Sequence, residues 1–86
     1  MNITQITMYS STTCTTCVGL GNWLNQNGFE YSKKLVDDSA ETMNEFLSVS
    51  DNFIGVPFTV ITYDDSHQTK IPGYDRKAFK AALDLA

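Results

Sequence analysis

The sequence predicts an α/β fold with the element order β-α-β-α-β-β-α, in which a mixed four-stranded sheet carries helices on both faces. Short runs of β-branched and aromatic residues alternate with segments whose apolar residues recur at helical spacing. Helical connections predict parallel pairing between the first strands, whereas a tight turn predicts a hairpin between the last two. The 86 residues contain no repeat, linker or low-complexity segment, so we expect a single domain over residues 1–86.

The first strand and the first helix follow from the spacing of their apolar residues. Residues 3–9 place apolar groups on both alternating faces, so we expect a buried strand at the centre of the sheet. After a polar loop, Leu20, Trp23 and Leu24 recur at helical spacing and predict a buried helix stripe. Gly28 is expected to end this helix, because glycine adopts the left-handed conformation that follows many helix termini.

Two glycines, Gly19 and Gly21, lie inside this predicted helix. Each weakens the helix by up to about 1 kcal/mol relative to alanine, because glycine loses more backbone freedom on folding. We therefore expect them to permit close packing or a close approach to the neighbouring loop.

The second strand and the second helix are predicted between residues 29 and 50. Residues 29–36 place Tyr31 and Leu35 on one alternating face and polar residues on the other, which predicts a strand with one wet side. Asp38 followed by Glu41 fits a capping box, so the second helix is expected to open at Asp38.

The last three elements are a hairpin and a helix. Residues 58–63 form an apolar run suited to a strand that is buried on both faces. A turn signal at residues 64–66 leads to a short strand ending near Ile71, so these two strands are expected to pair as a hairpin. Asp75 is placed as the N-cap of a last helix that buries Phe79.

The only two cysteines follow the first strand as Cys14-Thr15-Thr16-Cys17. In this position the first sulfur lies at a helix N-terminus, where free amide donors and the helix dipole favour the thiolate, and the second is within reach to close a disulfide. Half of a zinc site and an incidental pair of structural thiols are the other interpretations. A closed zinc site usually needs four ligands, and only His67 adds to the two cysteines, so the pattern favours redox chemistry.

The composition argues against nucleic acid and membranes as partners. The formal net charge is -4, whereas both partners reward clustered Lys and Arg. The densest basic group, formed by Arg76, Lys77 and Lys80, is expected to be a solvated helix face. Neither a signal peptide nor a membrane-spanning segment is predicted, so we expect a cytoplasmic protein, in a compartment where a lone Cys-x-x-Cys is more often catalytic than structural.

Three motifs together resemble the glutaredoxin and NrdH-redoxin group of the thioredoxin-fold superfamily. They are Cys14-Thr15-Thr16-Cys17 after the first strand, Val56-Pro57 before the third strand and Gly73-Tyr74-Asp75 before the last helix. The resemblance covers essentially the whole chain. It implies a thioredoxin-like fold and a dithiol–disulfide oxidoreductase that reduces protein disulfides and acts as an electron donor.

The resemblance also implies roles for individual residues. Cys14 is the attacking thiolate and Cys17 the resolving thiol, and the Val56–Pro57 peptide bond is cis and packs against the cysteine pair. No metal ligand and no bound cofactor are implied beyond the redox-active Cys14–Cys17 disulfide. The expected substrate or glutathione contacts are Thr13, Thr16, Val56, Pro57, Gly73, Tyr74 and Asp75.

Departures from the family pattern leave the reductant open between glutathione and thioredoxin reductase. Thr15 and Thr16 stand where glutaredoxins usually carry Pro and Tyr, and Ser11 stands where a basic residue is usual. Expected partners are disulfide-containing proteins, with ribonucleotide reductase as a candidate, for a chain expected to be a monomer. The competing functions are a zinc or iron–sulfur module built on the same cysteines, and a non-catalytic thioredoxin-fold adaptor.

Overall fold

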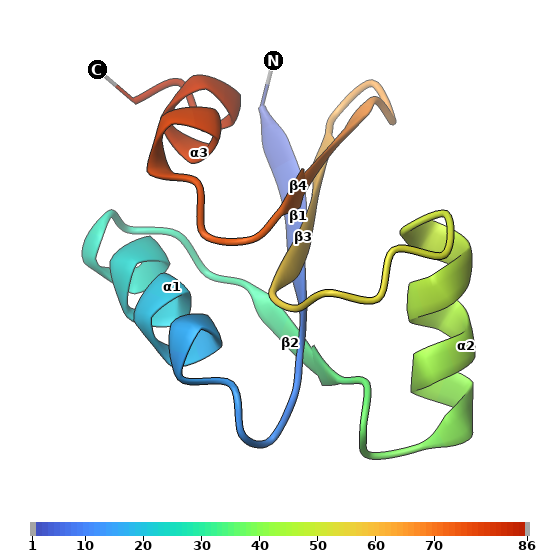
Figure 1. The fold of residues 1–86 in the computed structure, drawn as a ribbon. Coiled ribbons are helices and arrows are strands. Elements are labelled where there is room, and N and C mark those ends of the chain that lie inside the picture. The colour runs from blue at the N-terminus through green and yellow to red at the C-terminus, as the bar shows by residue number, and fades with distance from the viewer. Residues whose placement is uncertain (1, 86) are drawn as a thin grey trace.

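The structure, a computed structural model, describes residues 2–85 and has the predicted order of elements (Figure 1). The helices α1 and α3 cover one face of the sheet and α2 covers the other (Figure 1). The elements are β1 (Ile3–Ser10), α1 (Thr15–Gln26), β2 (Ser32–Leu35), α2 (Ala40–Val49), β3 (Phe58–Tyr63), β4 (Gln68–Pro72) and α3 (Arg76–Ala82).

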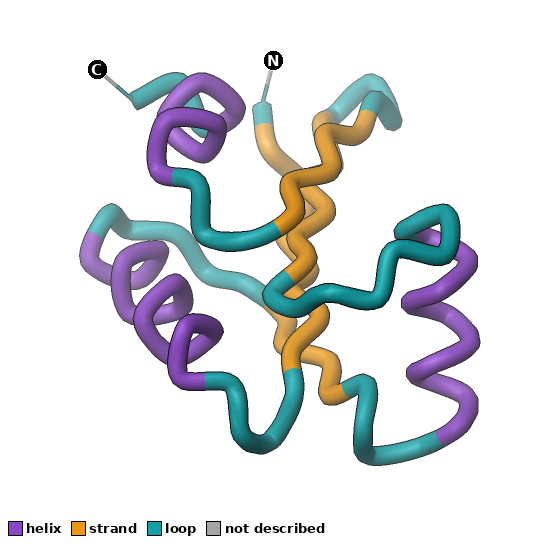
Figure 2. The backbone as a smooth tube through the Cα atoms, in the orientation of Figure 1, coloured by secondary structure: helices purple, strands orange, loops and turns teal. Residues whose placement is uncertain are grey.

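The strands lie in the order β2-β1-β3-β4, so β1 is internal as the sequence predicts. It pairs parallel with β2 and antiparallel with β3, and β3 and β4 form the expected hairpin. Ser10 pairs with Leu35, and Tyr9 pairs with Phe58. The carboxyl ends of β1 and β2 therefore meet the amino end of β3 at one end of the sheet, and the loops that leave this end are shown in Figure 2.

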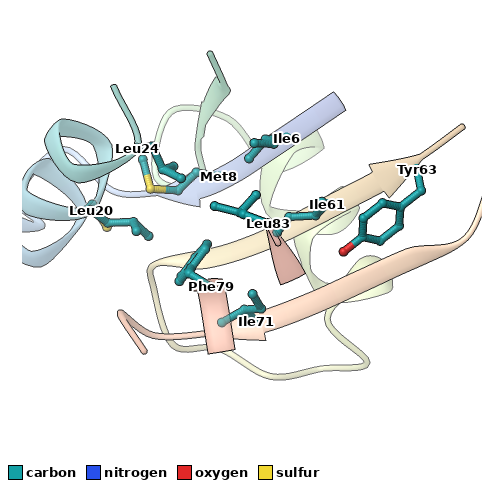
Figure 3. Close-up of a cluster of buried hydrophobic side chains, with 10 residues drawn as sticks. Ile6, Met8, Leu20, Leu24, Ile61, Tyr63, Ile71, Phe79 and Leu83 are labelled. Atoms are coloured by element: carbon teal, nitrogen blue, oxygen red, sulfur yellow. The ribbon is translucent and has the colours of Figure 1, made fainter. Parts of the chain in front are cut away.

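The larger hydrophobic cluster lies between the sheet and the helices α1 and α3 (Figure 3). Leu20 and Leu24 of α1 and Phe79 of α3 are fully buried in it, in agreement with the predicted helix stripes. Trp23 is half-buried at its margin, where its ring centroid lies 6.0 Å from that of Phe79. The remaining buried members are Ile6, Met8, Cys17, Ile61, Tyr63, Ile71 and Leu83.

A smaller cluster packs α2 against the opposite face of the sheet. Phe46 is fully buried there, with its ring centroid 5.5 Å from that of Tyr9 and 5.9 Å from that of Phe58. The Tyr9 hydroxyl donates a hydrogen bond of 2.5 Å to Glu45, which also forms a 2.6 Å ion pair with Lys34 of β2. Burial of the Tyr9 hydroxyl is the main cause that raises its pKa well above the ordinary value, and the nearby Glu45 carboxylate is the second cause. The hydroxyl therefore stays protonated.

The first helix ends in a Schellman motif that shortens the next strand. Gly28 has φ +83° and donates to the Asn25 carbonyl, and Phe29 donates to the Leu24 carbonyl. Because the Phe29 amide is used by the helix terminus, pairing with β1 starts only at Ser32. The prediction of a strand at residues 29–36 was therefore wrong at its start.

The second helix begins one residue later than predicted. Its N-cap is Ser39, whose hydroxyl accepts a 3.1 Å hydrogen bond from the Thr42 amide. Asp38 is not the cap, because its own amide closes a turn onto the Leu35 carbonyl. Asp75 does cap α3 as predicted and accepts a 3.2 Å hydrogen bond from the Ala78 amide.

Candidate functional site

Cys14 and Cys17 form a disulfide at the amino end of α1. Their Cα atoms are 5.2 Å apart, within the range that a disulfide requires. Cys14 is the N-cap residue, and its sulfur accepts a 3.1 Å hydrogen bond from the Cys17 amide. The first turn of α1 contains no acidic residue, so no carboxylate there opposes the positive end of the helix dipole.

The two sulfurs differ in their exposure. The Cys17 residue is only 2% exposed and belongs to the larger hydrophobic cluster, whereas Cys14 is half-buried at the edge of that cluster. An incoming disulfide therefore meets Cys14 first. Cys17 lies one helical turn further in and faces the core.

The Val56–Pro57 segment lies next to the cysteine loop. Its peptide bond is cis, as the family resemblance implies, and Pro57 is fully buried. Because β1 and β3 pair at Tyr9 and Phe58, Pro57 lies beside the start of the loop that leads to Cys14. Within residues 2–85 no backbone hydrogen bond uses the Val56 amide or carbonyl, so both groups remain available to a ligand.

Gly73 connects this segment to α3. It has φ +74°, a conformation that glycine adopts without steric cost, and its amide donates a 2.7 Å hydrogen bond to the Pro57 carbonyl. The next residue, Tyr74, is half-buried, with its ring centroid 6.2 Å from that of Trp23. Cys14, Val56 and Tyr74 therefore pack against the same cluster, although their contacts with a substrate stay a prediction.

The other predicted contact residues are placed differently. Thr13 precedes Cys14 and Thr16 precedes Cys17; both are exposed, and no hydrogen bond of their side chains is found within residues 2–85. The Asp75 carboxylate is exposed but already accepts from the Ala78 amide. Their roles in binding stay predictions. His67 is exposed in the β3–β4 turn.

Asp37 holds the loop before Cys14, and sequence reasoning missed it. Its carboxylate accepts a 2.7 Å hydrogen bond from the Thr12 hydroxyl and weaker ones of 3.2 and 3.3 Å from the Thr12 amide. These hydrogen bonds lower the pKa of Asp37 below its ordinary value, and the bond from the Thr12 hydroxyl has the largest effect. The carboxylate thus stays ionised at neutral pH and links the β1–α1 loop to the β2–α2 loop.

A second missed residue is Lys33, which lines a cavity of about 400 Å³ together with both cysteines. Tyr31 and Leu35 line the same cavity. The residues 31, 33 and 35 alternate along the chain and point to one face of the sheet. The predicted strand pattern already placed Tyr31 and Leu35 on one face, and this signal could also have identified Lys33.

Within residues 2–85 the structure brings together no group of three or more His, Cys, Asp or Glu side chains that could hold a metal ion. Over the same residues, none of the helices has both the length and the apolar character needed to cross a membrane.

A match to a protein family identifies the group of proteins to which this chain belongs. The glutaredoxin family model matches residues 6–70, well over half of the chain. The chain belongs to the glutaredoxin family. This match and the Cys14–Cys17 pair support thiol–disulfide oxidoreductase activity. No curated protein sequence gives a significant match.

Solved structures confirm the predicted thioredoxin-like fold. The thioredoxin-like protein BC3987 superposes with a TM-score of 0.76 at 24% identity, over 92% of this chain and 100% of that chain. The glutaredoxin from Methanosarcina mazei gives a TM-score of 0.74 at 22% identity, over 94% of this chain and 79% of that chain. The glutaredoxin from Brucella melitensis gives a TM-score of 0.58 at 17% identity, over 98% of this chain and 83% of that chain. At these identities the likeness concerns the fold.

Proposed function

We propose that the protein is a cytoplasmic dithiol–disulfide oxidoreductase that reduces protein disulfides through Cys14 and Cys17. The observation that carries this proposal is the disulfide at the start of α1, with one sulfur near the surface and the other in the core. The family match supports it. The chain acts as a monomer and uses no bound cofactor.

The reaction proceeds in two exchanges. The Cys14 thiolate attacks one sulfur of the target disulfide, so that the target S–S bond breaks, a mixed disulfide forms and the other target sulfur leaves as a thiolate. Cys17 then loses its proton and attacks the Cys14 sulfur, which releases the second target thiolate and forms the Cys14–Cys17 bond. Two electrons pass from the protein to the target.

Activation of Cys14 relies on the helix terminus. The Cys17 amide that donates to the Cys14 sulfur in the disulfide also faces the thiolate after reduction, and the helix dipole adds to it. We therefore expect a Cys14 pKa below the free-thiol value of about 8.5. Thiolate absorbance against pH measures it, and a value at or above that of a free thiol contradicts activation by the helix.

Substrate binding uses the surface around the cis peptide bond. The unpaired Val56 amide and carbonyl bind the backbone of the target beside its cysteine, as an added strand does. Thr13, Thr16 and Tyr74 form the rim of this surface, with Pro57, Gly73 and Asp75 beneath and beside it. Ribonucleotide reductase is the candidate physiological target, by analogy with the family.

Two variants test the cysteine roles. Cys14→Ser is expected to abolish disulfide reduction, whereas Cys17→Ser is expected to accumulate a mixed disulfide, detected as the added mass of the target. Full activity of Cys14→Ser contradicts the mechanism. Stoichiometric zinc or an iron–sulfur chromophore in protein purified without chelator indicates a metal module, and partner binding that survives loss of both cysteines indicates an adaptor.

The reductant is tested by two recycling systems in parallel. Reduced protein is regenerated with NADPH and thioredoxin reductase, or with NADPH, glutathione and glutathione reductase, while insulin reduction is followed. Val56, Gly73 and Asp75 match the positions expected to contact glutathione, whereas Ser11 supplies no cation for its carboxylate. The faster system identifies the reductant.

A further inference from the structure

The cavity beside the disulfide contains a free positive charge. Cys14, Cys17 and Lys33 line one cavity of about 400 Å³. Val56, Pro57 and Gly73 do not line it, so this cavity extends away from the Val56 and Gly73 surface. A substrate that reacts at Cys14 can therefore bind a second part of its chain in this cavity.

Lys33 is the only charged side chain among the residues that line this cavity. Within residues 2–85 it forms no ion pair, whereas the adjacent Lys34 points to the other face of the sheet and is paired with Glu45. Asp37 contacts the cavity wall through Thr12, and its carboxylate already accepts three hydrogen bonds there. The Asp37 carboxylate is ionised but forms no ion pair with Lys33, so the Lys33 ammonium group has no charged partner within residues 2–85.

The rest of the cavity wall suits the carbon stem of an acidic side chain. Val18, which is 60% exposed, and the half-buried Leu35 supply apolar surface, and Asn22 supplies an amide. A carboxylate that approaches Lys33 can keep its stem on this apolar surface and remain near the cysteines. Over the whole molecule the net charge of -4 repels anions, so the attraction is local to this cavity.

We propose that this cavity binds the carboxylate of an acidic residue next to the target cysteine, with Lys33 as its partner. This proposal rests on the disulfide reductase function proposed above and adds a preference among its protein substrates. Lys33 is a specificity-determining residue in this scheme, and the cysteines carry the chemistry.

Single-turnover kinetics with paired peptides tests the preference. Each peptide has blocked termini and one cysteine linked to 2-thiopyridine, with either Glu or Gln beside the cysteine. The reduced protein attacks the peptide sulfur, the peptide–thiopyridine S–S bond breaks, and neutral thiopyridone is released and measured by its absorbance. No reductase is needed, and the ratio of the Glu to the Gln rate constant cancels any effect of a variant on Cys14 reactivity.

We expect the wild-type ratio to be about two- to fivefold in favour of Glu, the effect of one exposed ion pair. Lys33→Gln is expected to reduce this ratio to about 1, and Lys33→Glu to invert it by a similar factor. Lys34→Gln is the matched control, because it removes the same charge from the adjacent residue on the opposite face, and it should keep the wild-type ratio. Increasing salt should reduce the ratio in wild type and in Lys34→Gln, and it should leave the ratio in Lys33→Gln near 1.

A wild-type ratio of about 1, or the same ratio in wild type and Lys33→Gln, overturns the proposal. It is also overturned if Lys33→Gln slows only the reaction with oxidised glutathione, since the cavity then serves the reductant. Failure of the parent function looks different. In that case the wild-type protein releases thiopyridone no faster than Cys14→Ser with either peptide, and both proposals fall together.

Discussion

Gly19 and Gly21 lie two residues apart in α1, and replacing each with alanine should change stability in opposite directions. Both glycines lie within a helix, so alanine offers each the same gain in backbone entropy, up to about 1 kcal/mol. Their surroundings differ. A Cβ atom added at Gly19 would lie 3.8 Å from a ring carbon of Tyr74, an ordinary contact.

At Gly21 the added Cβ atom meets the side chain of Tyr31. It would collide with the Tyr31 hydroxyl and lie 2.9 Å from the ring carbon that carries it. Overpacking of this kind typically costs about 1–3 kcal/mol, which equals or exceeds the helix gain. We therefore expect the free energy of unfolding of Gly21→Ala to be about 1–3 kcal/mol lower than that of Gly19→Ala.

Urea unfolding of the oxidised proteins, followed by far-ultraviolet circular dichroism, measures this difference. In a Tyr31→Ala background the collision is absent, and Gly21→Ala should then stabilise the protein as Gly19→Ala does. If Gly21→Ala is as stable as Gly19→Ala in the wild-type background, the Tyr31 ring moves aside without cost and the packing argument is refuted.

Two further predictions concern the contact between Asp37 and Thr12 and the smaller hydrophobic cluster. Because the folded-state pKa of Asp37 is lowered, its carboxylate contributes stability above the unfolded-state pKa of about 3.9, and this contribution is lost as the pH falls through the folded-state pKa. Asp37→Asn should therefore lose less stability than wild type between about pH 5 and pH 3 in urea unfolding, and a pH dependence equal to that of wild type argues against the contact between Asp37 and Thr12. Phe46→Ala, at a fully buried position, should cost about 3–5 kcal/mol in the free energy of unfolding, and a cost no larger than that of Phe53→Ala, at a 46% exposed position, would contradict the importance of this cluster.

The order of elements could be predicted from the sequence because it depends on local patterns. The capping carboxylate of Asp75 and the ending of α1 at Gly28 act within a few residues of themselves, and both predictions were confirmed. The length of β2 depends on a competition that local patterns do not show. Phe29 has the residue type of a strand, but its amide bonds to the Leu24 carbonyl and is lost to the sheet.

The same distinction separates the site residues that were found from those that were missed. Cys14 and Cys17 are three residues apart, so one helical turn brings them together and the spacing alone reveals the pair. Asp37 is 25 residues from Thr12, and only the parallel pairing of β1 with β2 brings the two loops together. Lys33 reaches the cavity for the same reason, because β2 lies alongside the strand that leads to the cysteines.

The separation of the two hydrophobic clusters gives this protein an internal optical reporter. Its single tryptophan, Trp23, lies in the cysteine-bearing helix and at the edge of the cluster that contains Cys17. Fluorescence therefore samples the face of the sheet on which the disulfide opens and closes. The α2 face has no tryptophan within residues 2–85, so the fluorescence of the protein reports on the disulfide face and not on the packing of α2.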